Sequence, residues 1–316
     1  MMTKYYLLVV QSQKRRTRSS SDCSPTSKVS VLSVNKKIGA KKISPTSKRL
    51  RLHPMRKLLS LITAASLATS TLAHFSIYGV WLNGEFQGDG RHVYERTKVH
   101  WELNPPYYNS DWAYIACNTL GHRAVPKWIE VKAGDTFAPE WYWWERGDYT
   151  AANHLGPRKY PLHPFLVHMA PAVPGPTGVN TPGIWTKLYH YAYNTTDHKW
   201  SNQYFKSDAE STRGHHFITI PDVPAGDYII RSEIIALQIA DTPYGAQHYP
   251  SCVQVRVTTN GTTELPGGDS FPGSYVPGQP GLLWPTADES DPAKYPIPGG
   301  PVWEGSPGGG IYGLNA

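Results

Sequence analysis

The chain has 316 residues, with 31 Lys+Arg against 24 Asp+Glu, a balance that would ordinarily suggest a nucleic acid or a membrane surface as partner. The excess of positive charge lies almost entirely in residues 1–54, which hold 13 Lys+Arg and one acid, Asp22. From residue 74 onward 16 Lys+Arg face 23 Asp+Glu, and this acidic balance removes the argument for a nucleic-acid partner.

Residues 1–54 are rich in Ser and Thr and show no sustained apolar periodicity. Such a composition cannot bury enough apolar surface to fold, so we expect this segment to be disordered. A second explanation is that Met55 is the true start of the protein and that the upstream extension is not expressed. The next segment favours this second explanation.

Residues 55–73, MRKLLSLITAASLATSTLA, have the three parts of a secretory signal peptide. Arg56 and Lys57 form the basic region, an apolar run follows, and Thr71 and Ala73 are small residues before the expected cleavage site. The apolar run is short for a membrane span, although a transit peptide or a type II membrane anchor are alternatives. We expect a secreted, extracellular protein that begins at His74 and has no membrane segment after cleavage.

Beyond residue 74, short runs rich in Val, Ile, Tyr and Trp alternate with Gly, Pro and Asn clusters, and helical periodicity is scarce. This pattern predicts an all-β protein, an immunoglobulin-like antiparallel β-sandwich with long loops. We place the domain at residues 74–303 and expect residues 304–316 to form a Gly-rich tail.

Cys117 and Cys252 are the two cysteines after residue 74, and a pair in a secreted domain is expected to form one disulfide. Asn194 and Asn260 begin N-glycosylation sequons, which agree with the secretory route, although such tripeptides are common by chance.

His74 would carry two nitrogen donors if it were the first residue of the secreted chain, the free amino group and the imidazole. Together with one more imidazole they would give a three-nitrogen set suited to copper. An N-terminal His is weak evidence by itself, and an ordinary structural role deserves similar weight.

Eight motifs that follow one another along the chain strengthen this interpretation. They read HFSIYGVWLNGEFQGDGRHV, DWAYIACNTLG, GDYTAANHLGP, FLVHMAP, IPDVPAGDYIIRSEIIALQIA, GAQHYPSCVQVRV, FPGSYVPGQPG and YPIPGGPVW. In order and approximate spacing the chain resembles the fungal lytic polysaccharide monooxygenases of the cellulose-active auxiliary activity family nine, formerly a glycoside hydrolase family. The resemblance covers nearly all of residues 74–303.

The resemblance implies one copper ion per chain, held by the amino group and Nδ1 of His74 and by a second histidine. His154 in NHLGP occupies the place of that second histidine. Tyr249 matches the axial tyrosine and Gln247 the neighbouring glutamine of the catalytic centre. Cys117 and Cys252 match the family's disulfide.

The chain departs from the family pattern in two places. RKYPLH separates HLGP from the strand that should follow it, so His163 is a rival of His154 as ligand, although the residues around His154 match better. Gln238 and Ser232 stand where the family usually has histidines. An amide can donate a hydrogen bond near the metal but cannot act as an acid near neutral pH.

The function that this resemblance implies is oxidative cleavage of cellulose or a related β-1,4-glucan at C1 and/or C4. The reaction would use O2 or H2O2 and an external electron donor, and the protein would act as a monomer. The alternatives are a non-catalytic secreted copper-binding or glycan-binding protein on the same fold, and a structural sandwich if His74 is not the mature terminus.

Overall fold

The computed structural model describes residues 75–96, 114–142, 146, 163–175, 178–204, 214–285 and 291–311. All of them belong to one unit of the chain, Ala64–Ala316. The predicted upstream segment and signal peptide, and His74 and His154, lie outside the described residues. Within the described ranges, no helix combines the length and apolar character needed to cross a bilayer.

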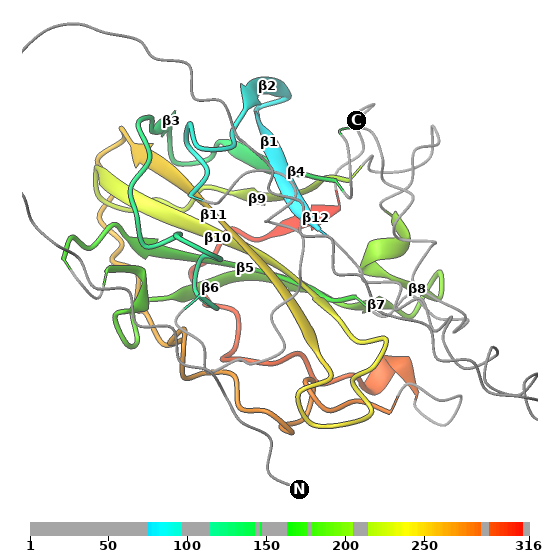
Figure 1. Cartoon of the computed structure of the whole chain (residues 1–316). Helices are drawn as coiled ribbons and strands as arrows, with labels where there is room; N and C mark the ends of the chain where they lie inside the picture. The colour runs from blue at the N-terminus through cyan, green and yellow to red at the C-terminus, as the bar shows by residue number, and fades with distance from the viewer. Residues whose placement is uncertain are drawn as a thin grey trace, which may run out of the picture. The chain divides into compact units, whose positions relative to one another are not determined.

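Two five-stranded sheets form the domain (Figure 1), and the predicted all-β sandwich is confirmed. The first sheet has the order β12-β9-β4-β1-β2. Its strands are β1 (Ser76–Leu82), β2 (Glu85–Asp89), β4 (Thr136–Tyr142), β9 (His216–Thr219) and β12 (Gly309–Ile311). All of its described pairings are antiparallel. β12 lies within the segment expected to be a tail, where small glycines let the backbone approach Phe217 and Tyr189 closely.

The second sheet has the order β3-β11-β10-β5-β6. Its strands are β3 (Ile129–Val131), β5 (Phe165–Pro171), β6 (Thr186–Tyr191), β10 (Gly226–Ala236) and β11 (Gln247–Val257). β3 pairs with β11 in parallel, and the other described pairs are antiparallel. The short strands β7 (Tyr193–Asn194) and β8 (Lys199–Trp200) form a separate hairpin, and 3-10 turns span Gly178–Asn180, Ser201–Tyr204 and Pro292–Lys294.

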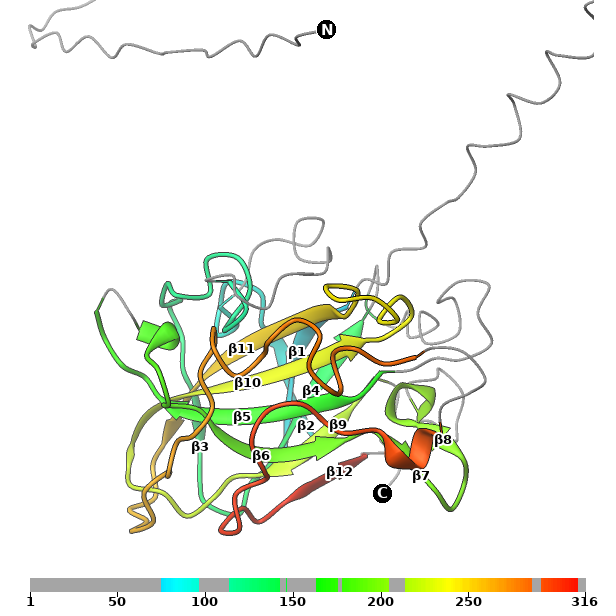
Figure 2. The same ribbon diagram turned by 90° about the horizontal axis from the view of Figure 1, so that it is seen from below.

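The second sheet is buried on both faces. One face packs against the first sheet through apolar side chains such as Val167, Met169 and Ile230. The other face is covered by the segments around Cys117 and by the C-terminal segment that contains Phe271 and Tyr275. In Figure 2 this C-terminal segment, drawn in orange, runs across β10, β5 and β6.

β10 contains charged and polar residues among apolar ones, yet the strand is buried at nine consecutive positions. The charged side chains of β10 have hydrogen-bond partners close by. Arg231 Nη1 donates to Glu233 Oε2 at 2.8 Å, and the hydroxyl of Tyr275 donates to the same oxygen at 2.7 Å. His248 Nδ1 lies 2.9 Å from Glu233 Oε1. These contacts satisfy charges that would otherwise be costly to bury.

The predicted disulfide between Cys117 and Cys252 is confirmed, with the two Cα atoms 5.2 Å apart. Cys252 lies on β11 directly opposite Arg231 of β10. The Arg231 guanidinium donates to the carbonyl oxygens of Ala116 and Ile115 at 2.8 and 2.9 Å. The disulfide and the arginine therefore attach the same loop to the central strands.

Candidate functional site

The β10–β11 hairpin places the predicted Gln247 and Tyr249 at one end of the second sheet. In the register Gln247 faces Ala236 and Tyr249 faces Ile234. The Tyr249 ring is buried, and its hydroxyl donates to Gln247 Oε1 at 3.0 Å. Since this bond engages the amide oxygen, the Nε2 end of Gln247 is the end that carries the donors.

Phe75 joins the beginning of β1 to this end of the hairpin. Its ring meets the ring of Tyr249 edge-on at 5.3 Å between centroids and that of His163 at 5.5 Å. His74 precedes Phe75 directly in the chain. The side chains of Tyr249 and His163 therefore flank the residue to which the predicted first ligand is covalently attached.

His163 precedes Pro164 and the first residue of β5. Its side chain is fully buried, and neither ring nitrogen has a hydrogen-bond partner in the part of the chain that the structure describes. Burial lowers the pKa of His163 to about 3, and the Gln238 side chain only partly opposes this shift. The imidazole is therefore neutral, which is the form that binds metals.

Gln238 follows the end of β10, and its side chain is almost fully buried. Its Oε1 makes no hydrogen bond to any of the described residues. Buried polar atoms without partners are uncommon in native proteins and call for an explanation, such as an unseen water or ion. His163 and Gln238 provide three such atoms at one end of the sandwich.

The described residues contain no cluster of three or more His, Cys, Asp or Glu side chains arranged to hold a metal ion. Ser232 is buried in the middle of β10 opposite Ser251. Asn194 lies on β7 and is partly exposed, and Asn260 is exposed in the loop after β11. Both sequons are therefore at the surface of the described fold.

Sequence reasoning missed the contacts made by Phe75 and the buried ion pairs of the second sheet. His168 on β5 is buried, with Nε2 3.1 Å from Asp269 Oδ2. In the sequence, the only sign of these buried ion pairs is the presence of charged residues within apolar strands, such as Arg231 and Glu233 in IIRSEII. Spacing along one strand does not say which distant carboxylate an imidazole will meet.

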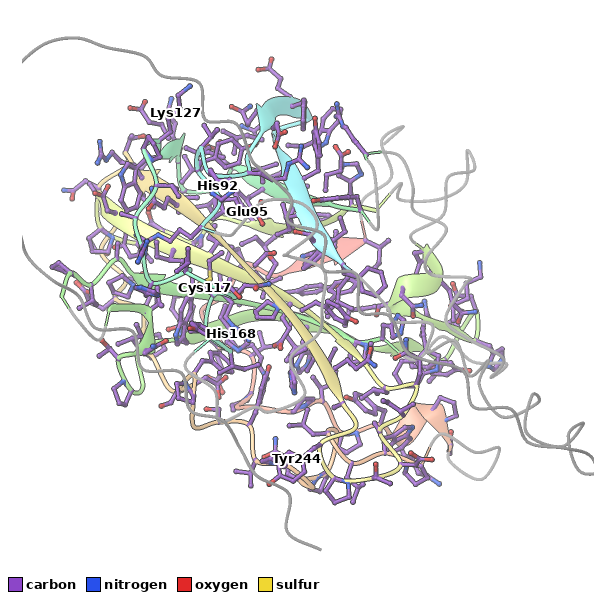
Figure 3. All side chains as sticks on the ribbon, viewed as in Figure 1. His92, Glu95, Cys117, Lys127, His168 and Tyr244 are labelled. Atoms are coloured by element: carbon purple, nitrogen blue, oxygen red, sulfur yellow. A yellow bond between two sulfur atoms is a disulfide. The ribbon has the colours of Figure 1, made fainter. Side chains whose placement is uncertain are left out.

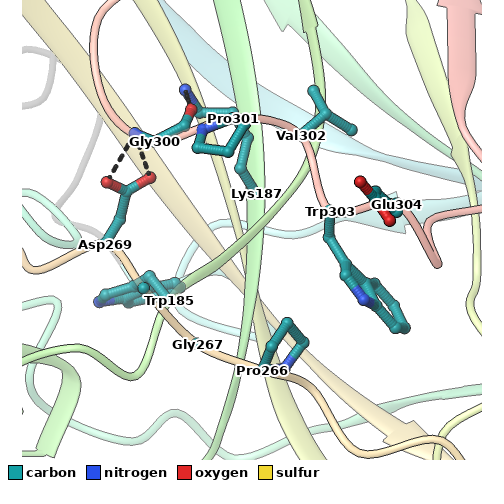
Figure 4. A pocket seen from close by; sticks show the side chains of 11 residues that line it. Trp185, Lys187, Pro266, Gly267, Asp269, Gly300, Pro301, Val302, Trp303 and Glu304 are labelled. Carbon is teal, nitrogen blue, oxygen red and sulfur yellow. Dashed lines mark hydrogen bonds between the residues drawn. The ribbon is translucent and has the colours of Figure 1, made fainter.

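A surface pocket of about 420 Å³ lies away from these residues, between two parts of the C-terminal segment (Figure 4). Lys187 and Asp269 line it, but both are already engaged. Lys187 Nζ donates to the carbonyl oxygens of Pro298 and Gly300, and Asp269 accepts from the Gly300 amide at 3.0 Å. The pocket contains none of the predicted site residues, and its charged groups serve to hold the segment on the sheet.

Comparisons with known proteins agree with the sequence motifs. The profile of Auxiliary Activity family 9, formerly GH61, matches residues 74–295. An AA9 family lytic polysaccharide monooxygenase A of Armillaria gallica is 40% identical over 266 residues, which cover 81% of this chain and 98% of that protein. A protein of the same name from Schizophyllum commune is 38% identical and is covered over its whole length.

Two solved structures resemble the described fold. CvAA9A superposes with a TM-score of 0.64 at 30% sequence identity, over 74% of this chain and 99% of that chain. Cel61B from Hypocrea jecorina, a glycoside hydrolase family 61 member, superposes with a TM-score of 0.56 at 21% identity, over 73% of this chain and all of its own. The second likeness supports the β-sandwich fold alone.

Proposed function

The chain belongs to Auxiliary Activity family 9, and from this membership we propose that it cleaves cellulose or a related β-1,4-glucan by oxidation at C1 and/or C4. The members of this family are copper-dependent lytic polysaccharide monooxygenases, and the chain is an enzyme of this kind. The glucan specificity, the position of oxidation, the use of O2 or H2O2 and the external electron donor are parts of the proposal.

The residues at the end of the β10–β11 hairpin fit a copper ion. We propose that His74, through its amino group and Nδ1, and Tyr249 would hold the ion. A buried, neutral imidazole without a partner, His163, lies against Phe75, which follows His74 in the chain. Imidazole nitrogen is a favoured ligand of copper. This unpartnered imidazole is the observation that carries the proposal.

The second histidine of the copper site can be His154 or His163. The sequence around His154 matches the family pattern better, whereas the contacts of His163 favour that residue. We propose His163, because a fully buried imidazole with two unpaired nitrogens gains most from a metal ligand. His154 lies outside the described residues and stays a rival.

Copper, when bound, supplies the one-electron redox chemistry that oxidises a C–H bond of the glucan. Tyr249 holds the Gln247 amide in one orientation, with Oε1 as acceptor and Nε2 as donor. Gln238 contributes a neutral amide where a histidine would contribute a proton. Since the Gln247 amide is not an acid either, we expect protons near the metal to come from water. No step requires the pair of carboxylates used by hydrolytic glycosidases.

Secretion and a monomeric state complete the proposal. The relatives' family is secreted, and residues 55–73 have the pattern of a signal peptide. We propose that cleavage after Ala73 creates the amino group of the copper site. We also propose that the protein acts alone on an extended glucan and receives electrons from a diffusible donor.

The experiment that tests this proposal begins with the secreted protein. Mass spectrometry of its N-terminus should return His74, and calorimetry should then show one tightly bound Cu(II) per chain. Incubation of the copper-loaded protein with cellulose and a reductant should release oligosaccharides with oxidised ends. A different N-terminal residue would remove the proposed bidentate ligand.

A second candidate function is a secreted copper-binding or glycan-binding protein without turnover. Gln238 in place of the family's usual histidine, and Ser232 after Arg231, favour it. Stoichiometric copper binding together with no oxidised product from any β-glucan tested would support this function over the enzyme.

A further inference from the structure

Two glutamine amides, those of Gln238 and Gln247, lie at the two ends of the loop between β10 and β11. Figure 3 shows Tyr244 of this loop at the end of the described fold opposite His92 and Lys127. Gln247 Oε1 accepts a hydrogen bond at 3.0 Å, whereas Gln238 Oε1 has no hydrogen-bond partner among the described residues. Gln238 is therefore the amide whose role calls for an explanation.

The backbone around Gln238 is held in place by two hydrogen bonds. The amide of Ala240 donates to the carbonyl oxygen of Leu237 at 3.1 Å, which closes a turn with Gln238 at its second position. The amide of Trp284 donates to the carbonyl oxygen of Ala240 at 2.8 Å and fixes this turn to the C-terminal segment. The direction in which the Gln238 side chain leaves the backbone is therefore set by the fold.

The backbone of His163 is fixed close to the same turn. The amide of Ile235 donates to the carbonyl oxygen of Pro164 at 3.0 Å, so the residue after His163 is attached to β10 three residues before Gln238. The hydroxyl of Ser201 donates to the carbonyl oxygen of His163 itself. With its backbone held at two neighbouring carbonyls, His163 keeps freedom mainly in the orientation and the tautomer of its ring.

The side chains of His163 and Gln238 face each other inside the protein. They are 0% and 8% exposed. The Gln238 side chain opposes the effect of burial on the pKa of His163, which is what an acceptor atom facing the ring does. The amide oxygen and both ring nitrogens nevertheless complete no hydrogen bond of normal geometry with any described residue. A small rotation of either side chain would pair two of these three atoms.

The chemistry of the two groups decides which ring nitrogen carries hydrogen. A neutral imidazole has one nitrogen that donates and one that accepts, whereas an amide oxygen can only accept. The ring nitrogen that faces Gln238 Oε1 is therefore the one that carries the hydrogen. The other nitrogen keeps its lone pair, which is what a metal ion binds. A histidine in place of Gln238 could donate or accept, and it would leave this choice open.

We propose that Gln238 is a positioning residue for the copper site, because its amide oxygen accepts from one ring nitrogen of His163 and leaves the other nitrogen to bind the metal. This proposal rests on the proposed function, in which His163 is a copper ligand. Histidines that bind metals almost always donate their second ring nitrogen to a carboxylate, a carbonyl oxygen or water. Gln238 thereby acts on the metal through His163 and need not touch a reacting atom.

A second buried amide, that of Asn202, is the rival acceptor. Asn202 follows Ser201, whose hydroxyl binds the carbonyl oxygen of His163, and it is 1% exposed. Neither Oδ1 nor Nδ2 of Asn202 has a hydrogen-bond partner among the described residues. Of the two amides, Gln238 is the one that affects the pKa of His163. Asn202 therefore supplies the matched control for the experiment.

The first measurement uses the secreted protein freed of copper, with its histidines labelled with 15N. Nuclear magnetic resonance of the ring nitrogens reports the tautomer of His163, whose signals are assigned by their loss in His163→Ala. Wild type should show a single tautomer. Gln238→Leu, which removes the acceptor, should show a mixture of the two tautomers or the opposite one. Asn202→Leu should keep the tautomer of wild type.

The second measurement is Cu(II) binding, followed by calorimetry and electron paramagnetic resonance. Gln238→Leu should bind Cu(II) at least about tenfold more weakly, the lower end of the loss for residues behind metal ligands, and its spectrum should change. Gln238→Glu, which keeps an acceptor, should bind at least as tightly as wild type, and Asn202→Leu should leave affinity and spectrum unchanged. Gln238→Leu should melt no lower than wild type, because it removes a buried unpaired oxygen, so weaker binding would not reflect a weaker fold.

The proposal is overturned if Gln238→Leu keeps the tautomer or the Cu(II) affinity of wild type, or if Asn202→Leu changes them and Gln238→Leu does not. Its failure is separable from that of the proposed function. Wild type that oxidises cellulose while Gln238→Leu keeps tautomer and affinity refutes the role of Gln238 alone. Wild type that releases no oxidised product, while Gln238→Leu changes the tautomer and weakens Cu(II) binding, upholds the role of Gln238 and refutes the enzyme.

Discussion

The proposed copper site depends on one residue, the buried and neutral imidazole of His163. His163 is fully buried beside Phe75, and burial holds its pKa at about 3. A buried nitrogen that stays unpaired costs about 1 to 3 kcal/mol, which a metal ligand bond would remove. At the scale of one residue, the proposed copper site therefore explains an otherwise unfavourable feature of the fold.

Replacing His163 by Ala should weaken Cu(II) binding at least about tenfold, the lower end of the loss seen even for residues behind the ligands of metal sites. The electron paramagnetic resonance spectrum should change as well. His154→Ala is the matched control and should have a smaller effect on both. The opposite result, with His154→Ala abolishing tight binding, would assign the second histidine to His154 and leave His74 and Tyr249 in place.

Glu140 is a second residue whose environment has a measurable consequence. Its buried carboxylate accepts from Trp81 Nε1 at 2.7 Å and from Arg146 Nε at 2.8 Å, and His215 Nε2 lies 3.6 Å away. Burial would raise the pKa of Glu140, but His215, Arg146 and Trp81 outweigh it and lower the pKa to about 2. The Glu140 carboxylate therefore stays ionised to a lower pH in the folded protein than in the unfolded chain.

The stability from Glu140 is fully present above the ordinary carboxyl pKa of 4.5 and is lost as the pH falls toward about 2. Glu140→Gln lacks this titration. Its melting temperature should therefore fall less than that of wild type between pH 5 and pH 3. If the melting temperatures of the two proteins fall equally over this range, the pKa of Glu140 is not lower in the folded state.

At the scale of elements, the β10–β11 hairpin organises the site. It carries Gln247 and Tyr249, it is joined to the loop around Cys117 by the disulfide, and Arg231 binds the same loop. Because Cys252 and Tyr249 are three residues apart on one strand, the disulfide holds the strand that positions the proposed axial ligand.

Replacing Cys117 and Cys252 by Ser should lower the free energy of unfolding by about 2 to 4 kcal/mol, because the bond closes a long loop of 135 residues. Chemical denaturation of the oxidised protein and of the double variant measures the difference. Copper should also bind more weakly in the variant. Equal stability of the two proteins would mean that the sandwich, and not the disulfide, holds the hairpin.

Arg231→Met should destabilise the fold by about 3 to 5 kcal/mol, because it leaves the Glu233 carboxylate buried without its main positive partner. Urea unfolding measures this loss. Arg256→Met is a matched control, since Arg256 pairs with Asp227 at the surface and its loss should change the free energy of unfolding little. Similar losses for both variants would contradict the role assigned to the buried pair.

The alternation of residues along strands predicted the sandwich but not the burial of both faces of its second sheet. Alternation distinguishes one face from the other, and it does not reveal that a distant C-terminal segment covers the polar face of β10. The sequence Thr-Pro-Tyr-Gly is typical of a turn, but only the structure shows that Tyr244 has a positive φ, 68°.

For the whole molecule, ordered motifs predicted the family, because several motifs in one order are more specific than any one residue. Gln247 and Tyr249 lie together, since one strand carries both. The position of His163 against Phe75 could not be predicted, because it joins segments far apart in the chain. The proposed function depends on all of these segments being folded and on the proposed cleavage that would make His74 the first residue.

Product analysis on cellulose tests the central claim most directly. Secreted protein that begins at His74, loaded with one copper per chain, is incubated with cellulose and ascorbate, and the soluble products are analysed by mass spectrometry. We predict oligosaccharides with aldonic-acid or 4-keto ends, and none when either copper or ascorbate is left out. Copper-loaded protein with the correct N-terminus that releases no oxidised oligosaccharide from cellulose or another β-glucan would contradict the account.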